Sequence, residues 1–455
     1  MKKYRFKGIL QNEGWIENAT ISVDDAGLIS SISSESQNVE QVAGYALPGF
    51  QNAHSHAFQY AMAGIAERHQ AGKEADDFWS WREAMYQLAL TMSPDDLEAV
   101  ATMLYAEMAR HGYTQVAEFH YLHHDIDGKP YANLAEHGER LVSAAQKAGI
   151  KITLVPMFYQ RGGFGLDPQP RQRRFISKTI EDYDKLLTAS KQATSHYSGA
   201  NLGYGVHSLR AATPDDFVRL LEEKRTIPFH IHIAEQLKEI EDSISYLKKR
   251  PVQWLLDNVN IDDNCHLVHA THLIEEEIKG IANSGANVVL CPSTEGNLGD
   301  GIFPLKQFQS LGGKWSIGTD SHIGLNPLEE LRILDYGQRL TSHNRNTFTD
   351  KNENDSGTYA IKQSQITGRK AMGNTNIKYF AVGQPFDAVV YDANTALLAA
   401  CSIDNLLSTI VYASDSTWVL GTMVDGKWVV KDQNHSQKEK ITLKFKETIQ
   451  KLKVR

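Results

Sequence analysis

The feature that most constrains the fold is a regular alternation of short apolar segments with helical ones through the middle of the chain. The segments with the length and character of strands are YALPGF, TQVAEF, KITLVPMF, LGYGVH, IPFHIHI, CHLVHA, NVVLCP and KWSIGT. One intervening helix begins at Ser93 and Pro94, a typical start, and ends at Gly112. Such alternation favours a parallel sheet, and eight units favour a closed (β/α)₈ TIM barrel. An open doubly wound sheet fits less well, because no G-x-G-x-x-G follows an early strand.

Both ends of the chain are rich in strand-forming residues. YRFKGIL, ENATISVD and LISSISS come early, and FDAVVYDA, TIVYASDS and WVLGTMVDGKWVV come late. The Asp-Gly pair in MVDGKW predicts a hairpin. We expect residues 1–48 and 373–435 to form one discontinuous β-sandwich domain. Residues 49–372 would then form the catalytic barrel, and the basic stretch 436–455 a C-terminal helix.

Composition excludes several classes of function. The formal net charge is -8, which argues against nucleic-acid binding, since such a surface must neutralise phosphates. The cysteines, Cys265, Cys291 and Cys401, are too few and too widely spaced for a disulfide framework. No apolar run of about 18 residues predicts a membrane helix, and the N-terminus lacks the features of a signal peptide. We expect a cytoplasmic protein that does not bind membranes.

Metal-ligand side chains occur where successive predicted strands end. His54 and His56 follow the first strand, His232 lies on the fifth and Asp320 follows the eighth. In a (β/α)₈ barrel these ends meet on one face, where active sites lie. Side chains at i and i+2 of a strand point the same way, so His54 and His56 can share one ion. We therefore expect one divalent metal ion on these four residues, with Zn²⁺ as the default and Fe²⁺ or Mn²⁺ as alternatives.

Further residues fit the chemistry of a water bound to that ion. The ion would lower the pKa of the water toward ~7 and give a hydroxide nucleophile at neutral pH. Glu235 lies three residues after His232 and is the candidate proton shuttle. His269, at the end of the sixth strand, is placed to orient the water or stabilise developing charge, and Asp320 can also help to deprotonate the water. Each pattern alone is a weak signal, and the hypothesis rests on their conjunction.

These motifs resemble the signatures of the amidohydrolase superfamily. LPGFQNAHSH is similar to the first-strand signature, and HIAEQ, LVHAT and GTDS are similar to later strand motifs. Members with two metal ions carry a bridging lysine after the fourth strand, whereas GYGVHSLR has none there, which implies a single ion. The stretches HSHAFQYAMAGIAER, DDFWSWREAMY, GYTQVAEFHYLHH, PMFYQRGGFG and GVHSLRA most resemble the formimidoylglutamate deiminases. The resemblance covers essentially the whole chain.

The resemblance implies an activity and a set of substrate-binding residues. The activity is hydrolysis of N-formimino-L-glutamate to N-formyl-L-glutamate and ammonia in histidine degradation, by a homodimer. The implied substrate-binding residues are Gln59, Arg82, Tyr121, His207 and Arg210. Arginine suits this small dicarboxylate, because a guanidinium can hold a carboxylate with two hydrogen bonds. We expect Arg82 in a loop after the first strand and Arg210 after the fourth, with Arg161 as a weaker candidate.

Two other functions stay open. An enzyme of the same fold could deaminate a ring such as guanine, but its site would need stacking and base-edge contacts rather than two arginines. A non-catalytic metal-binding scaffold is the other alternative, and it would have no need of Glu235 as a proton shuttle. Turnover of formiminoglutamate and of guanine separates these hypotheses.

Overall fold

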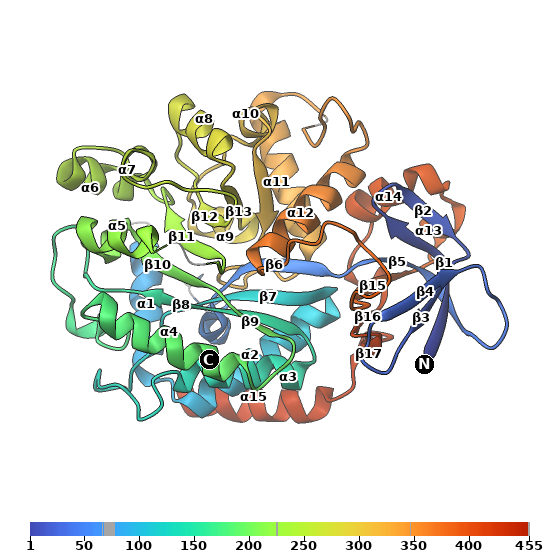
Figure 1. Cartoon of the computed structure of the whole chain (residues 1–455), viewed down its shortest axis with the longest axis horizontal. Helices are drawn as coiled ribbons and strands as arrows, with labels where there is room; N and C mark the ends of the chain where they lie inside the picture. Colours follow the sequence, from blue (N-terminus) through green and yellow to red (C-terminus); the bar gives the residue numbers. More distant parts are fainter. Residues whose placement is uncertain (66, 68–77, 224–225, 346, 454–455) are drawn as a thin grey trace.

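The computed structural model describes residues 1–65, 67, 78–223, 226–345 and 347–453. Residues 454–455, the end of the predicted C-terminal helix, lie outside the described residues. A barrel surrounded by helices forms one part of the molecule, and a sheet shared by the two chain ends forms the other (Figure 1).

Within the described residues, eight parallel strands follow one another around the barrel. They are β6 (Phe50–Ser55), β7 (Tyr113–His120), β8 (Lys151–Phe158), β10 (Tyr204–Ser208), β11 (Phe229–Ile233), β12 (Cys265–His269), β13 (Asn287–Leu290) and β14 (Lys314–Ile317). The short strand β9 (Ala200–Leu202) pairs with β8. The barrel closes between β14 and β6, where the amides of Thr319 and Asp320 donate to the His54 carbonyl at 3.1 and 3.0 Å. The predicted TIM barrel is confirmed.

Helices cover the barrel and start where the sequence supplies caps. Those before β11 are α1 (Phe78–Thr91), α2 (Pro94–Arg110), α3 (Glu136–Ala148), α4 (Ile180–Thr194) and α5 (Pro214–Glu222). Those after β11 are α6 (Leu237–Leu247), α7 (Pro251–Asn258), α8 (Glu275–Ser284), α9 (Pro292–Leu298), α10 (Leu305–Ser310), α11 (Pro327–Ser342) and α12 (Ser356–Ala371). At the start of α2, the Ser93 hydroxyl accepts from the Asp96 amide and the Asp96 carboxylate accepts from the Ser93 amide. This reciprocal cap satisfies two amides that the helix itself leaves unpaired.

The two ends of the chain share one sheet. Its strands are β1 (Lys2–Gln11), β2 (Gly14–Glu17), β3 (Thr20–Val23), β4 (Ile29–Ser33), β5 (Glu40–Pro48), β15 (Ala388–Asp392), β16 (Val419–Val424), β17 (Lys427–Lys431) and β18 (Asn434–His435). Antiparallel pairing of β5 with β15 joins the N-terminal strands to the C-terminal ones. The predicted hairpin lies between β16 and β17, where Asp425 and Gly426 both have positive φ (48° and 65°), as a tight two-residue turn requires.

Two details of the expected strand pattern are wrong. YALPGF was expected as the first barrel strand, but its residues up to Pro48 belong to β5 of the terminal sheet, and the barrel strand is β6, beginning at Phe50. TIVYASDS was expected as a strand, but residues up to Ala413 lie in the helix α14 (Leu406–Ala413). The buried residues of α14 include Leu406 and Ile410, four positions apart, so they share one helical face. A short apolar run does not distinguish strand from helix without that packing.

The C-terminal helix α15 (Lys438–Leu452) lies along α2 at the bottom of the view in Figure 1. The ammonium of Lys451 contacts both carboxylate oxygens of Asp96, at 2.9 and 2.8 Å. The same Asp96 caps α2, so the end of the chain is tied to the start of a barrel helix. The short helix α13 (Ala396–Ala400) lies next to α14. Among the described helices, none is long and apolar enough to cross a membrane.

Candidate active site

Four predicted metal ligands converge at the carboxyl ends of the barrel strands. His54 lies on β6, His56 follows it, His232 lies on β11 and Asp320 follows β14, and all four side chains are buried. One ligand atom from each lies within 4.8 Å of the others. The Nε2 atoms of the three histidines are 3.1–3.3 Å apart, and Asp320 Oδ1 is 3.2 Å from His56 Nε2. The predicted set is thus brought together around one point.

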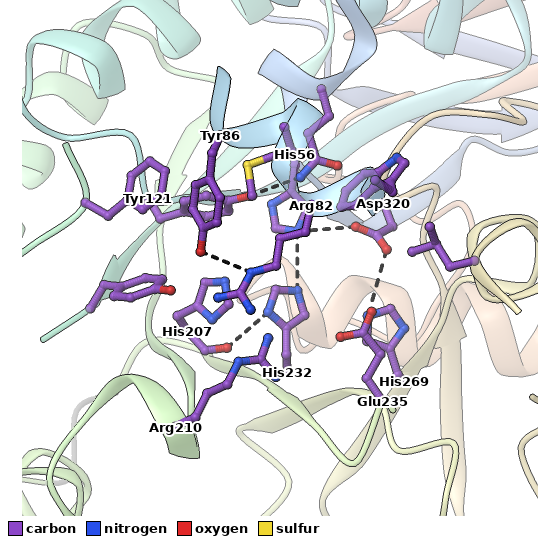
Figure 2. A pocket seen from close by; sticks show the side chains of 16 residues that line it. His56, Arg82, Tyr86, Tyr121, His207, Arg210, His232, Glu235, His269 and Asp320 are labelled. Carbon is purple, nitrogen blue, oxygen red and sulfur yellow. Dashed lines mark hydrogen bonds and ion pairs between the residues drawn. The ribbon is translucent and has the colours of Figure 1, made fainter. Parts of the chain in front are cut away.

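The ring orientations of this cluster suit a metal ion. His56 Nδ1 donates to the Phe119 carbonyl at 2.9 Å, and His232 Nδ1 donates to the His207 carbonyl at 3.0 Å (Figure 2). Protonation at Nδ1 leaves each Nε2 with its lone pair directed into the cluster, the state that a metal ligand needs. Burial lowers the pKa of His54 to about 3, so this ring is neutral as well. Three neutral imidazoles and one carboxylate are a donor set that fits a divalent transition-metal ion.

A carboxylate and a histidine lie next to the cluster without belonging to it. His269 Nε2 lies 3.7 Å from Glu235 Oε1 and 3.8 Å from Asp320 Oδ2, and all three face the same space (Figure 2). Burial raises the pKa of Glu235, which moves this group toward neutral pH. Burial by itself would lower the pKa of His269, but the neighbouring carboxylates, Glu235 foremost, outweigh it and raise that pKa to about 10. A carboxylate and a protonated imidazole are therefore available for proton transfer beside the metal ligands.

Glu295 is a residue of this group that the sequence analysis missed. It lies on α9, after β13, and its carboxylate accepts a hydrogen bond from His269 Nδ1 at 3.2 Å. The same oxygen accepts from the Cys291 amide at 2.8 Å. Glu295 therefore orients the ring of His269 toward Glu235 and Asp320. The available signal was its position shortly after the seventh barrel strand, on the face where the other site residues lie.

A buried carboxylate braces the segment that carries the first two ligands. Glu118 on β7 accepts from the Ala57 amide at 2.6 Å, from the Ser55 hydroxyl at 2.7 Å and from the Tyr105 hydroxyl at 2.9 Å. Ser55 lies between His54 and His56, so these hydrogen bonds fix both sides of the second ligand. Because partners outside the metal site orient its ligands, Glu118 contributes to the geometry without touching the cluster.

Several residues at the site have left-handed backbone. φ is +53° at Ala234, +69° at His269, +50° at Ala270, +46° at Asp320 and +65° at His322. Residues other than glycine adopt this region at some energetic expense, and such strain concentrates at functional sites. The backbone hydrogen bond from Asp320 to His54 holds one of these conformations in place.

The predicted substrate-binding residues line one pocket over the cluster. The pocket includes Gln59, Arg82, Tyr121, His207 and Arg210, together with His56, His232, Glu235, His269 and Asp320. His54 lies directly behind it, within the cluster. Gln59 Nε2 donates to the Tyr121 hydroxyl at 3.0 Å, and Arg82 Nε donates to the Tyr86 hydroxyl at 3.0 Å. The fold therefore assembles every residue of the predicted site.

Two expectations about arginines were wrong. Arg82 lies on helix α1, not in a loop, and Trp81, Met85 and Tyr86 on the same helix also line the pocket. Arg161 does not line it, and its guanidinium pairs with Asp167 at 2.8 Å near a separate surface cleft. Tyr86, Tyr159, Phe175 and Leu298 also line the pocket and were not predicted from the sequence. A signal was available for Tyr86, because it lies one helical turn after Arg82.

Arg210 has one carboxylate nearby. Its Nη1 lies 3.9 Å from Glu239 Oε2, and the same Glu239 oxygen accepts from the Glu235 amide at 3.0 Å. Glu239 is buried and lies on α6. It therefore connects the pocket arginine to the backbone of the candidate proton shuttle.

The fold and the site together define a class of protein. A (β/α)₈ barrel with three histidines and one aspartate at its strand ends, and with Glu235 and His269 beside them, is the architecture of a metal-dependent hydrolase. The family model described as "Amidohydrolase family" matches residues 45–429. The chain belongs to the amidohydrolase family, whose members depend on metal ions.

Individual relatives agree with this assignment. The chain is 43% identical to formimidoylglutamate deiminase from Pseudomonas aeruginosa, over 95% of each protein. It is 25% identical to 5-methylthioadenosine/S-adenosylhomocysteine deaminase from Desulforamulus reducens, over 93% of this chain and 89% of that protein. The crystal structure of an amidohydrolase from Brucella melitensis superposes with a TM-score of 0.92 at 40% identity, covering 99% of this chain and all of the other. A zinc-bound adenosine deaminase from Xanthomonas campestris has the same fold, with a TM-score of 0.80 at 18% identity and coverage of 100% and 98%.

Proposed function

We propose that this protein hydrolyses N-formimino-L-glutamate to N-formyl-L-glutamate and ammonia. The observation that carries the proposal is one pocket that combines the histidine–aspartate cluster with two arginines, Arg82 and Arg210. The 43% identity to a formimidoylglutamate deiminase over nearly the whole chain supports the same activity. A substrate with two carboxylates and one formimino group needs both kinds of binding partner.

We propose that His54, His56, His232 and Asp320 bind a single zinc ion. Nitrogen and oxygen ligands of this kind also accept iron or manganese, and zinc is the default because it binds such ligands and can add a water to its coordination shell. The fourth barrel strand, β10, and the residues after it contain His207 and Arg210 but no lysine, which supports a single ion. When bound, the ion would lower the pKa of a coordinated water toward ~7 and make it nucleophilic at neutral pH.

The protein's own residues would then move protons and stabilise charge. Glu235 is placed to accept a proton from the attacking water and to pass it to the departing nitrogen, so that the C–N bond breaks and ammonia leaves. His269, held by Glu295, would stabilise the charge that develops on the oxygen and nitrogen atoms of the tetrahedral state. Asp320 would assist the first proton transfer from the other side. Water adds and ammonia departs, so the net reaction converts the formimino group to a formyl group.

The substrate carboxylates would be held by Arg82 and Arg210. A guanidinium forms two parallel hydrogen bonds with a carboxylate, which fixes its orientation as well as its position. Gln59, Tyr121 and His207 would add hydrogen bonds along the pocket wall. This grip would place the formimino carbon over the cluster, where proximity alone accelerates the attack.

The deciding experiment measures ammonia release by protein of known metal content. Formiminoglutamate, formiminoaspartate and guanine are offered separately, and we expect turnover of formiminoglutamate. Activity on guanine alone would show that a ring deaminase is the correct reading. Release of no ammonia from any of the three by metal-replete protein would favour a metal-binding scaffold.

Three broader properties belong to the same proposal. We propose that the enzyme acts in histidine degradation and as a homodimer, as the resemblance to the formimidoylglutamate deiminases implies, and that it lies in the cytoplasm. The free thiols Cys265, Cys291 and Cys401 are compatible with a reducing compartment. We also propose a division into residues 1–48 with 373–435, 49–372 and 436–455. The ends of β5 at Pro48 and of β18 at His435 support these boundaries.

A further inference from the structure

A short segment after β8 contacts the middle and the C-terminal end of helix α1. We call Arg171, Gln172, Arg174 and Phe175 the α1 clamp. Helix α1 supplies Trp81, Arg82, Met85 and Tyr86 to the pocket, so whatever fixes this helix also fixes one of the two arginines. The clamp lies more than 80 residues away in the sequence from the helix end that it holds.

Arg174 holds the C-terminal end of α1. Its side chain is fully buried, and its Nη1 donates to the carbonyls of Ala89 and Met92 at 2.5 and 2.7 Å. Its Nε donates to the His124 carbonyl at 2.8 Å. Carbonyls at the end of a helix have no hydrogen-bond partner within the helix, and they carry the partial negative charge of the helix dipole. The Arg174 guanidinium supplies both hydrogen-bond donors and a positive charge.

Burial of the Arg174 guanidinium costs free energy, so the contacts that compensate its charge bear on the position of α1. Among the described residues, Arg174 makes no ion pair, and its remaining partners are the Tyr131 hydroxyl at 3.4 Å and His137 Nε2 at 3.3 Å. An unpaired charge in a protein interior is expensive unless hydrogen bonds compensate it. Here part of the compensation comes from the carbonyls of Ala89, in the last turn of α1, and Met92, just after it, so the buried guanidinium favours this position of the helix end.

The rest of the clamp contacts the middle of α1. Gln172 Nε2 donates to the hydroxyls of Tyr159 and Tyr86, at 3.0 and 3.3 Å. The Phe175 ring stacks on the Tyr86 ring with the ring centres 5.9 Å apart. The Arg171 guanidinium also lies over the Tyr86 ring, 4.9 Å from its centre. Tyr86 in turn accepts from Arg82 Nε at 3.0 Å. The contacts thus run from the clamp through Tyr86 to the pocket arginine.

We propose that the α1 clamp positions Arg82, with Arg174 and Gln172 as positioning residues, and so sets the distance between the Arg82 guanidinium and the histidine–aspartate cluster. That distance selects the length of the dicarboxylate substrate. The inference rests on the proposed function, in which Arg82 holds one substrate carboxylate. A guanidinium holds a carboxylate through two parallel hydrogen bonds of fixed geometry, so a displaced Arg82 would bind the substrate carboxylate less tightly and raise KM.

The test uses Arg174→Met and Gln172→Leu in the full-length, metal-replete enzyme. We expect each to raise the KM for formiminoglutamate about 10-fold or more, with kcat changed no more than about 3-fold and metal content unaltered. In an Arg82→Met background, either substitution should raise KM no further, because the residue through which it acts is gone. Arg173→Met is the matched control, since Arg173 hydrogen-bonds to the carbonyls of Ile126 and Pro170 and, within the described residues, makes no hydrogen bond to α1.

Each outcome bears on the clamp. If Arg174→Met yields no folded protein, Gln172→Leu decides alone, because it removes hydrogen bonds without removing a buried charge. An unchanged KM in the folded variants would overturn the proposal. So would a rise in KM that is just as large in the Arg82→Met background, since the effect would then bypass Arg82. The unaltered enzyme tests the proposed function by itself. If that function is wrong, this enzyme will not turn over formiminoglutamate, whatever the clamp variants do.

Discussion

Replacing Glu235 with glutamine tests whether this carboxylate transfers the proton. The substitution keeps the shape of the side chain and the hydrogen bond from the residue-235 amide to Glu239. It removes the negative charge that lies 3.7 Å from His269 Nε2. Glu235 is not one of the four residues whose ligand atoms cluster, so metal content should not change.

The expected loss follows from the general contribution of a proton-transfer group. A positioned general acid–base group contributes about 10²–10⁴-fold to the rate, or about 3–5 kcal/mol in the barrier. We therefore expect kcat to fall by about 10²–10⁴-fold while KM changes little.

The assay is steady-state ammonia release, with metal content measured on the same preparation. Glu241→Gln is the matched control, because Glu241 lies nearby on α6, the helix that begins just after Glu235, and its side chain is exposed. Near-normal turnover of the Glu235→Gln enzyme with full metal content would refute the proton-transfer role. Loss of the metal would instead show that Glu235 is a ligand.

Three further predictions concern binding, metal and stability. Arg82→Met and Arg210→Met should each raise KM about 10–10²-fold, because charged hydrogen bonds contribute about 1.5–3 kcal/mol each. Removing the metal with a chelator should abolish turnover and lower the melting temperature, and zinc at about 100 times its Kd should restore about 2.7 kcal/mol of stability. Ser93→Ala should lower the free energy of unfolding by about 1 kcal/mol through loss of the α2 cap, with kcat unchanged.

Controls make these predictions decisive. Arg161→Met should leave KM unchanged, because Arg161 pairs with Asp167 outside the pocket. A KM that stays the same in both pocket variants would contradict the dicarboxylate grip. Full activity in chelator-treated, metal-free protein would rule out the metal site. A Ser93→Ala enzyme with normal stability but reduced kcat would mean that the α2 cap has a catalytic effect that its position does not explain.

Local pattern made the metal site predictable. His54 and His56 point the same way because they are two positions apart on extended backbone, and the barrel brings strand ends together whatever their separation in sequence. The same reasoning placed Glu235 and His269 correctly beside the cluster. It failed for TIVYASDS, where a run of a few apolar residues fits a strand and the helix α14 equally well.

The sequence did not predict contacts between segments that lie far apart in the chain. Glu295 orients His269 across 26 positions, and Arg174 holds the end of α1 across more than 80. Nothing in the residues around Arg174 marks it as buried, because its shortest hydrogen bonds go to main-chain carbonyls, which every residue possesses. Hydrogen bonds of this kind depend on which segments pack together, and composition and periodicity do not encode that.

The sequence by itself determined the class of fold, the histidine–aspartate cluster and the presence of two pocket arginines. Each of these follows from residue type and from the regular geometry of strands, which are local properties. Only the tertiary structure decided where Arg82 lies relative to the cluster, because that depends on how α1 packs against residues 171–175. The distance between a carboxylate grip and a reacting carbon is a global property of packing, and it is this distance that turns a general hydrolase site into a selective one.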